Sequence, residues 1–378
     1  MIYTNFKGKQ LSMLGFGLMR LPEKNGEIDA VQVEEMIDVA IKGGINYFDT
    51  AWPYHNGTSE TVVGQILKKY PRDSFYLADK FPGHQHFKEF HPEEIFEKQL
   101  EKCQVDYFDF YLMHNICENS LADYTDKRWG MLEYFVRQKR EGRIRHLGMS
   151  THASDETLRE ILDSEWGKET EFCQIQLNYV DWTLQKAKEK VDILREHNIP
   201  IWVMEGLRGG LLAGDNGATE QAFRWLQTIE GVTVVLSGMS NLEQAADNIR
   251  IFADKKTLID QEFDSLAYNC TLLDNALPCT ACRYCVNECP QGLDIPTLIA
   301  SYNDMKVTPK GQVAFTPLML IESLDDARQP KSCLGCDACA SVCPQGIDIP
   351  TAMRDLAESF EGAKKWSEIC EERNRITT

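Results

Sequence analysis

No apolar stretch of this 378-residue chain approaches the roughly 20 residues that a membrane-spanning helix needs. The first ten residues, Met1–Gln10, are polar, so no secretory signal peptide is expected. Basic side chains are also scarce, because 40 Lys and Arg face 58 Asp and Glu and leave a net charge of −18. Such a charge repels nucleic acid and anionic lipid. We therefore predict a cytoplasmic protein with no nucleic-acid and no membrane partner.

The sequence also lacks the glycine-rich phosphate turn of a doubly wound dinucleotide-binding sheet. Gly15-Phe16-Gly17 follows a strand-like run, but the third glycine and the following helix are missing. No flavin-binding fingerprint is present either. A doubly wound fold is therefore the weaker interpretation of the first part of the chain.

Short β-rich runs instead alternate with longer amphipathic stretches from Leu11 to about Ile251. The predicted strands are Leu14–Met19, Asn46–Thr50, Phe75–Lys80, Phe108–His114, His146–Ser150, Phe172–Asn178, Ile199–Glu205 and Val232–Ser237. The predicted helices are Ala30–Lys42, Ser59–Lys69, Pro92–Cys103, Trp129–Glu141, Ser154–Asp163, Leu184–His197, Thr219–Ile229 and Leu242–Phe252. Eight strands, each followed by a helix, predict an α/β fold of the (β/α)8 barrel type.

The texture of the sequence changes near Asp260, where strand patterns end and cysteines cluster. Cys279–Thr297 (CTACRYCVNECPQGLDIPT) returns as Cys333–Thr351 (CLGCDACASVCPQGIDIPT). We predict two domains, a barrel over residues 1–258 and a mostly helical iron–sulfur domain with a C-terminal helical tail over residues 259–378. Cysteine-rich sequence in a cytoplasmic chain favours metal over disulfides.

Each copy has the spacing C-x2-C-x2-C-x3-C-P, which is typical of two [4Fe–4S] clusters. The two-residue gaps let the chain curl round three corners of a cubane, and the proline directs the fourth thiolate to the other cluster. One predicted ligand set is Cys279, Cys282, Cys285 and Cys343, and the other is Cys333, Cys336, Cys339 and Cys289. Zinc fits less well, because it uses two C-x2-C pairs per site. The pattern resembles the mostly helical dicluster ferredoxin domains.

Five cysteines fall outside this pattern and receive no predicted role, since isolated cysteines are most often small buried hydrophobes. They are Cys103, Cys117, Cys173, Cys270 and Cys370.

A second set of reactive residues stands at the predicted strand ends of the barrel, where barrel enzymes carry their chemistry. Asp49, Tyr54, Lys80 and His114 come from three neighbouring strands. A buried lysine needs an anion, which Asp49 can supply. We expect the ammonium to lower the pKa of Tyr54, so that the phenol can protonate a carbonyl oxygen that His114 orients.

The flanking sequence resembles the aldo-keto reductase family over residues 10–252. The segments that carry the resemblance are FDTAWPYHNGTSETVVGQIL, YLADK, FYLMHN, GRIRHLGMS and VLSGMSNLEQAADNI. The resemblance implies an oxidoreductase acting on a small-molecule carbonyl. It also implies Asp49, Tyr54, Lys80 and His114 as the catalytic tetrad, with Tyr54 as general acid.

The same resemblance implies a nicotinamide site for NADP(H) or NAD(H). Ser150 and Gln174 match carboxamide-binding positions, Met204 stands where the family often has a stacking aromatic, and Gly206 replaces a usual proline. The other implied nucleotide contacts are Leu207, Arg208, Gly238, Ser240, Gln244 and Asn248, with Asn248 facing the adenine. The stretch from Gly238 to Gln244 has no Lys or Arg for a 2′-phosphate, although Arg208 and Arg250 are possible substitutes. The choice between NADP and NAD stays open.

Three histidines, His84, His86 and His91, follow Lys80, and a solvated loop near the substrate is expected there rather than a metal site. The aromatic residues Trp52, Tyr124 and Trp129 are candidates either for the substrate pocket or for ordinary packing.

Joining the two halves leaves three hypotheses, because a nicotinamide passes two electrons at once and a cluster passes one. In the first, the clusters relay electrons from a ferredoxin or flavodoxin-like carrier to a reductase barrel. In the second, the protein is an NAD(P)H-dependent carbonyl reductase with structural or redox-sensing clusters. In the third, it is a non-catalytic nicotinamide-binding regulator.

Overall fold

The computed structural model describes residues 1–85, 87, 89–118, 120–210, 212–214, 217–273, 276–307, 315–361 and 368. The side chains of 184, 267–273, 307, 315–316 and 319 lie outside that description. The chain forms two compact units, one from Met1–Leu207 and Leu211–Leu266 and one from Arg208–Gly210 and the residues from Ala267 onward.

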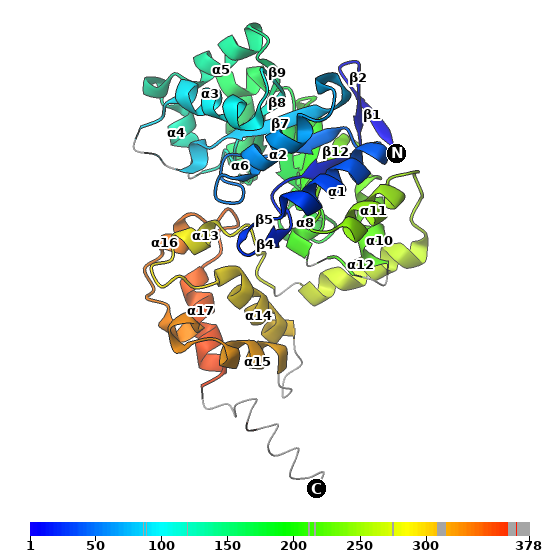
Figure 1. The fold of residues 1–378 in the computed structure, drawn as a ribbon. Helices are drawn as coiled ribbons and strands as arrows, with labels where there is room; N and C mark the ends of the chain where they lie inside the picture. Colours follow the sequence, from blue (N-terminus) through cyan, green and yellow to red (C-terminus); the bar gives the residue numbers. More distant parts are fainter. Residues whose placement is uncertain are drawn as a thin grey trace. The chain divides into compact units, whose positions relative to one another are not determined.

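The first unit is built on a closed barrel of eight parallel strands, as the sequence predicts (Figure 1). The strands are β3 (Leu14–Gly17), β6 (Tyr47–Asp49), β7 (Tyr76–Phe81), β8 (Phe108–Met113), β9 (Ile144–Thr151), β10 (Cys173–Gln176), β11 (Ile201–Met204) and β12 (Val232–Gly238). They follow one another round the barrel in chain order, and β12 closes on β3 through the pair Gly238 and Gly17. All eight carboxyl ends therefore meet at one mouth of the barrel.

Helices surround this barrel, and each of the eight predicted helices is present with small shifts of its ends. These eight are α1 (Ala30–Lys42), α2 (Ser59–Leu67), α3 (Pro92–Cys103), α5 (Met131–Arg140), α6 (Asp155–Asp163), α9 (Ala187–Glu196), α10 (Ala218–Leu226) and α11 (Leu242–Ile251). The sequence did not predict the short helices α4 (Leu121–Thr125), α7 (Glu165–Glu169) and α8 (Asp181–Leu184), or α12 (Asp260–Leu273), which runs across the boundary between the two units. In α1, Val33, Met36, Ile37 and Ala40 form the buried face at helical spacing, and the Asp29 side chain accepts from the Gln32 amide.

Two short hairpins escaped the sequence interpretation: β1 (Tyr3–Phe6) with β2 (Lys9–Ser12), and β4 (Glu23–Lys24) with β5 (Glu27–Ile28). Their strands are only two to four residues long and largely polar, so no alternation is visible. Phe6 nevertheless enters the barrel core, with its ring centroid 5.1 Å from that of Trp202 and 5.7 Å from that of Phe110. The first hairpin thereby fills the barrel interior from one side.

The second unit is mostly helical, in agreement with the sequence. Its helices are α13 (Tyr284–Asn287), α14 (Ile295–Val307), α15 (Phe315–Ser323), α16 (Ala338–Ser341) and α17 (Ile349–Ser359). Their buried apolar side chains, among them Leu293, Ile299, Met353 and Leu356, form one core. The predicted helical tail begins as α17, and residues 362–367 and 369–378 lie outside the described part of the chain. Among the described helices, none has the length and apolar character to cross a membrane.

Candidate active site and cysteine pockets

The four residues predicted as a catalytic set meet at the mouth of the barrel. Asp49 ends β6, Lys80 lies in the neighbouring β7, and His114 follows β8. Lys80 Nζ donates hydrogen bonds to Asp49 Oδ1, to the Thr50 carbonyl at 2.7 Å and to Tyr54 Oη at 3.2 Å. Lys80 and Asp49 are almost fully buried, so the ion pair has little contact with water. Adjacent parallel strands thus bring together four residues that lie apart in the sequence.

A tight turn after β6 holds the Tyr54 ring in this position. His55, Asn56 and Gly57 all adopt positive φ, and the Ser59 amide at the start of α2 donates to the Tyr54 carbonyl at 3.3 Å. The His55 ring is fixed on both sides, since Nε2 accepts from the Leu21 amide and Nδ1 bonds Glu23. The backbone on either side of Tyr54 is therefore anchored.

The prediction that Lys80 lowers the pKa of Tyr54 is wrong. Burial raises the pKa of Tyr54 well above its ordinary value, and the charge of Asp49 raises it further. The charge of Arg20 acts in the opposite direction without offsetting this increase. Tyr54 consequently keeps its proton throughout the neutral range, which is the state that a proton donor requires.

His114 is the neutral member of the set. Burial lowers the pKa of His114 well below its ordinary value, and the nearby His84 and Lys80 act in the same direction. Its ring stands edge-on to that of Tyr54, with centroids 5.9 Å apart, and 4.4 Å from that of His84. A neutral imidazole can donate one hydrogen bond to a carbonyl oxygen placed beside the phenol.

The loop after Lys80 is therefore only partly the solvated loop that the sequence predicts. His84 lies against His114, whereas the exposed His91 pairs with Glu89 at 3.7 Å. His86 lies outside the described residues. His152, whose pKa burial lowers to about 3, is a further imidazole near His84. Its place after β9 gave no signal in the sequence.

A buried polar network behind Lys80 also escaped the sequence interpretation. Gln99 Nε2 donates to the Lys80 carbonyl and to Glu60, each at 3.0 Å, and the Lys80 amide donates to Asp79 at 2.8 Å. Glu60 in turn pairs with Lys102. Burial raises the pKa of Asp79 well above its ordinary value, and the neighbouring Glu60 raises it further. This network fixes the backbone of β7 on the side away from the site.

The three candidate aromatic residues are engaged in packing. Tyr124 Oη donates to the carbonyls of Phe81 and His114, at 3.0 and 2.8 Å, and so links the ends of β7 and β8. The Trp129 ring packs against Phe90, and Lys102 Nζ lies 4.6 Å from the centre of the Trp52 ring. Tyr124 supports the catalytic strands from behind.

The two predicted carboxamide-binding residues lie side by side. Gln174 of β10 is in register with Ser150 of β9, and both side chains are buried. Ser150 Oγ accepts from the Asn115 amide at 2.8 Å. Gln174 Oε1 has no hydrogen-bond partner among the described residues. A buried acceptor without a partner is costly, so this site fits a ligand with an amide donor such as a nicotinamide carboxamide.

Of the other predicted nucleotide contacts, Arg208 belongs to the second unit, and the rest lie at or after the ends of β11 and β12. Met204 ends β11, Gly206 and Leu207 follow it, and Arg208 begins a short 3-10 turn. Gly238 ends β12, while Ser240 and Gln244 close a turn in which the Ser240 amide donates to Gln244 at 2.8 Å. Asn248 Nδ2 donates to Ser237 Oγ at 3.0 Å, within the barrel wall. Their nucleotide roles, including adenine recognition by Asn248, stay predictions.

Arg20 is a cation near this segment that the sequence interpretation missed. Its side-chain carbons lie 3.1–3.2 Å from the position that a Cβ at Gly238 would take, and its carbonyl accepts from Ser240 Oγ at 2.8 Å. Arg250, one of the expected substitutes, is paired with Glu220 and Asp247. Arg20 follows the first barrel strand, so only the closure of the barrel brings it to β12.

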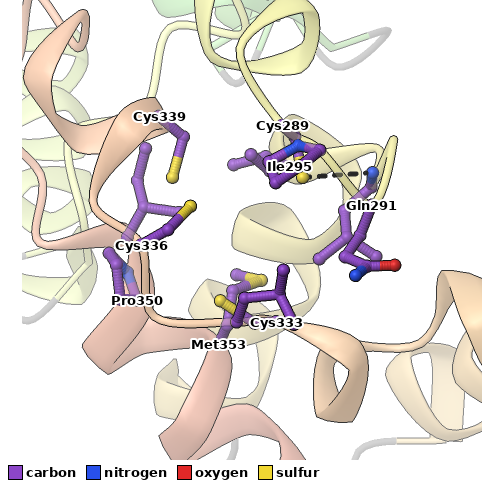
Figure 2. Close-up of a pocket in the computed structure, with 12 residues that line it drawn as sticks. Cys289, Gln291, Ile295, Cys333, Cys336, Cys339, Pro350 and Met353 are labelled. Atoms are coloured by element: carbon purple, nitrogen blue, oxygen red, sulfur yellow. Dashed lines mark hydrogen bonds between the residues drawn. The ribbon is translucent and has the colours of Figure 1, made fainter.

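The eight motif cysteines line two pockets in the second unit. Pocket A contains Cys279, Cys282, Cys285 and Cys343, and pocket B contains Cys289, Cys333, Cys336 and Cys339. Figure 2 shows the four sulfur atoms of pocket B facing a common space. Each pocket thus joins three cysteines of one motif copy to the last cysteine of the other copy, which is the crossed grouping that the spacing predicts.

Both pockets suit a cluster by the chemistry of their walls. Ile295 and Ile349 line both pockets, so the two spaces share walls. Backbone amides point at the sulfurs, from Ala281 to Cys279 at 3.4 Å and from Leu293 to Cys289 at 3.5 Å. Such hydrogen bonds stabilise cluster-bound sulfur.

The cysteine thiols need cations to ionise in these pockets. Burial raises the pKa of Cys339 to about 11, and the neighbouring Cys333 and Cys289 raise it further. Bound iron would supply the missing positive charge. Among the described residues, no three His, Cys, Asp or Glu side chains converge tightly enough to hold a single metal ion. Ligation of clusters by these cysteines stays a prediction.

Of the cysteines without a predicted role, Cys103, Cys117 and Cys173 are buried in the barrel unit. The side chains of Cys270 and Cys370 lie outside the described residues.

Comparison with known sequences places a family on each unit. The family model described as "Aldo/keto reductase family" matches residues 13–223, more than half of the chain. A model described as "4Fe-4S dicluster domain" matches residues 278–347. The two matches fall on the barrel and on the cysteine pockets respectively.

Individual relatives agree with the first match. The NADH-specific methylglyoxal reductase of Escherichia coli is 30% identical over 224 residues, 54% of this chain and 66% of that protein. The uncharacterized oxidoreductase YqkF of Bacillus subtilis is 25% identical over 306 residues, 68% of this chain and 92% of that protein.

Solved structures with the same fold include an aldo/keto reductase from Klebsiella pneumoniae in complex with NADP and acetate. It has a TM-score of 0.58 at 20% identity and covers 70% of this chain and 93% of its own. The holo form of AKR11C1 from Bacillus halodurans has a TM-score of 0.55 at 23% identity, with 69% and 93% covered.

Proposed function

The chain belongs to the aldo/keto reductase family and is an oxidoreductase of that type, and from this premise we propose that it reduces a small-molecule carbonyl at the mouth of its barrel while two [4Fe–4S] clusters relay electrons. The observation that carries the reductase proposal is the contact of Lys80 Nζ with both Asp49 and Tyr54 Oη. A neutral phenol beside a neutral imidazole is suited to give a proton to a carbonyl oxygen.

The chain's own residues supply the proton and the orientation. Tyr54 Oη donates its proton to the substrate oxygen, and the Lys80 ammonium 3.2 Å away stabilises the phenolate that remains. Asp49 keeps Lys80 charged and in place. The His114 imidazole holds the substrate oxygen in line with the phenol.

A bound nicotinamide would supply the hydride that reduces the carbonyl carbon. Ser150 and Gln174 would hold its carboxamide, because Gln174 Oε1 is buried without a partner among the described residues. Arg20 beside Gly238 is the described cation best placed to meet a nucleotide phosphate. The eight motif cysteines would hold the clusters, which would pass single electrons from a ferredoxin or flavodoxin-like carrier. Two such electrons and one proton are equivalent to the hydride, so this carrier and the reduced nicotinamide would be alternative electron donors.

The reductase proposal is tested by Tyr54→Phe in anaerobically reconstituted enzyme, assayed with NADH or NADPH and a panel of aldehydes and ketones. We expect kcat to fall by about 10²–10⁴-fold, the range of general acid–base catalysis. Tyr70→Phe is the matched control, because Tyr70 lies at the surface and bonds Asp38. Unchanged carbonyl reduction in Tyr54→Phe would remove Tyr54 from the mechanism.

The relay is tested separately by Cys282→Ala, which removes one cysteine of pocket A. Turnover with reduced ferredoxin should be lost while turnover with reduced nicotinamide is retained. Equal retention with both donors would favour the alternative, an NAD(P)H-dependent reductase with structural or redox-sensing clusters. The non-catalytic regulator is disfavoured by the complete hydrogen-bonded set around Lys80.

A further inference from the structure

The two cysteine motifs occupy equivalent places in the second unit but carry opposite charges beside their sulfurs. Arg283 follows Cys282 in the first copy, and Asp337 follows Cys336 in the second. Both residues have positive φ, 69° and 60°, and each precedes a four-residue helix, α13 or α16. The backbone therefore holds a cation at pocket A in the place where it holds an anion at pocket B.

The same difference in charge holds when all residues directly next to a cysteine of either pocket are counted. Of these neighbours, three are charged: Arg283, Glu288 and Asp337. Glu288 precedes Cys289, which lines pocket B. The cysteines of pocket A thus have one positive charge beside them, and those of pocket B have two negative charges.

The charges farther out leave the sign of this difference unchanged. Asp294 pairs with Arg283 at 3.0 Å, so it offsets part of the positive charge that Arg283 brings to pocket A. Asp348 stands at the equivalent position of the second copy, where it accepts a hydrogen bond from the Thr351 amide. Arg328 Nη1 lies 3.3 Å from the Gln291 carbonyl on the wall of pocket B. Its positive charge reduces the excess of negative charge around pocket B. Lys331, two residues before Cys333, is a second cation, but it is paired with Asp326 at 2.9 Å.

We propose that Arg283, opposed by Asp337 and Glu288, gives a cluster in pocket A a higher reduction potential than a cluster in pocket B, so that electrons pass from pocket B to pocket A. This inference rests on the proposed relay function. A cluster held by four thiolates is an anion and becomes more negative on reduction, so a neighbouring cation favours the reduced form and an anion opposes it. The exposed Cys336 acts in the opposite direction, because water also stabilises added negative charge. We assign the sign of the difference in reduction potential to the three charged residues, because they lie directly next to cysteines of the pockets.

The direction agrees with the surface of pocket B. Leu334 is 63% exposed and Cys336 is exposed, so this pocket is accessible to an external one-electron carrier. Ile295 and Ile349 line both pockets, so the two pockets share walls. This arrangement suits electron transfer from one pocket to the other.

The test is a potentiometric titration of the reconstituted full chain, followed by electron paramagnetic resonance. Wild type should show two midpoint potentials. Arg283→Gln should lower the higher potential, and Asp337→Asn should raise the lower one, each by about tenfold in the reduction equilibrium, or about 59 mV for one electron. Arg283→Asp combined with Asp337→Arg should narrow or invert the gap.

Lys306→Gln is the charge-matched control. Lys306 lies near the end of α14, about 16 Å along the helix from Ile295, so its loss should leave both potentials unchanged. Iron content equal to wild type establishes loading. If Arg283→Gln fails to retain clusters, two other variants test the proposal. Arg283→Lys keeps the charge and should leave the higher potential unchanged, and Asp337→Asn should raise the lower potential.

The proposal is overturned if Arg283→Gln shifts the lower potential, or if neither substitution moves either signal. Failure of the proposed relay is a separate result. It is measured by turnover of Cys282→Ala with reduced ferredoxin, whereas the order of the two potentials is measured in the wild-type chain and the charge variants.

Discussion

Lys80 is the residue on which the electrostatics of the barrel mouth depend. It is fully buried and contacts an aspartate carboxylate, a backbone carbonyl and the Tyr54 phenol. Burial raises the pKa of Asp49, and the charge of Lys80 acts against this increase. The two charges are tolerated in the barrel only as a pair.

Replacing Lys80 by Met should therefore destabilise the protein in a pH-dependent way. The variant leaves Asp49 buried without its partner, at a cost of about 3–5 kcal/mol at neutral pH. The folded-state pKa of Asp49 then rises further above its unfolded value, so the folded state binds the extra proton. Stability is consequently lost as pH rises through the raised pKa and regained toward acid. Melting temperatures measured from pH 5 to pH 8 check this.

Lys80→Met combined with Asp49→Asn is the control, because an amide carries no charge to bury. Its melting temperature should depend on pH as in wild type. If Lys80→Met alone lowers the melting temperature by the same amount at every pH, the buried charge of Asp49 is not the cause of the destabilisation.

At the scale of elements, the mouth of the barrel is held by structures that contribute no catalytic atom. Tyr124 from α4 ties β7 to β8, Gln99 from α3 bonds the Lys80 carbonyl, and the β1–β2 hairpin fills the barrel interior with Phe6. The contacts of Tyr124 and Gln99 fix β7 and the end of β8, the strands that carry Lys80 and lead to His114.

The Phe6 contact gives a measurable prediction. Phe6 is 2% exposed and packs against Trp202, Phe110 and His146. Phe6→Ala should reduce the free energy of unfolding by about 3–5 kcal/mol, since a buried aromatic is replaced by a cavity. Chemical denaturation followed by tryptophan fluorescence measures this. Val31→Ala, at a position 71% exposed, should have little effect. A small effect of Phe6→Ala would mean that the hairpin is dispensable for the barrel.

At the scale of the whole molecule, the two units depend on different sources of stability. The barrel has a continuous core of apolar and aromatic side chains. The second unit has a smaller core into which the motif cysteines are packed. A small domain with such a core commonly requires its metal to fold.

Metal removal should therefore destabilise the second unit and leave the barrel folded. Purified protein should hold about eight iron and eight sulfide per chain, four of each per cluster. Chelation under anaerobic, reducing conditions should make residues after Ala267 sensitive to protease while the barrel stays resistant, as mass spectrometry of the fragments would reveal. The same treatment of a variant with all four pocket B cysteines replaced by serine serves as a comparison. About one zinc and no sulfide in the purified protein would contradict the cluster assignment.

Much of this molecule was predictable because its signals are local and repeated. Eight alternations of strand and helix predict the barrel, and α1 and α3 begin and end at the predicted residues, because apolar spacing fixes which face of a helix is buried. The cysteine spacing predicts which sulfurs share a pocket, since two-residue gaps leave the chain few ways to turn. The polar hairpin strands β1, β2, β4 and β5 carry no such period and were missed.

The sequence by itself determined the barrel and the helical second unit, because these follow from periodicity and spacing along one segment. It also predicted the reactive residues from side-chain chemistry at the strand ends. Tertiary structure decided the protonation state of Tyr54, the contacts of His84 and His152 with the site, and the approach of Arg20 to Gly238. Those properties depend on burial and on charges from distant segments, which acquire values only when the strands close into a barrel.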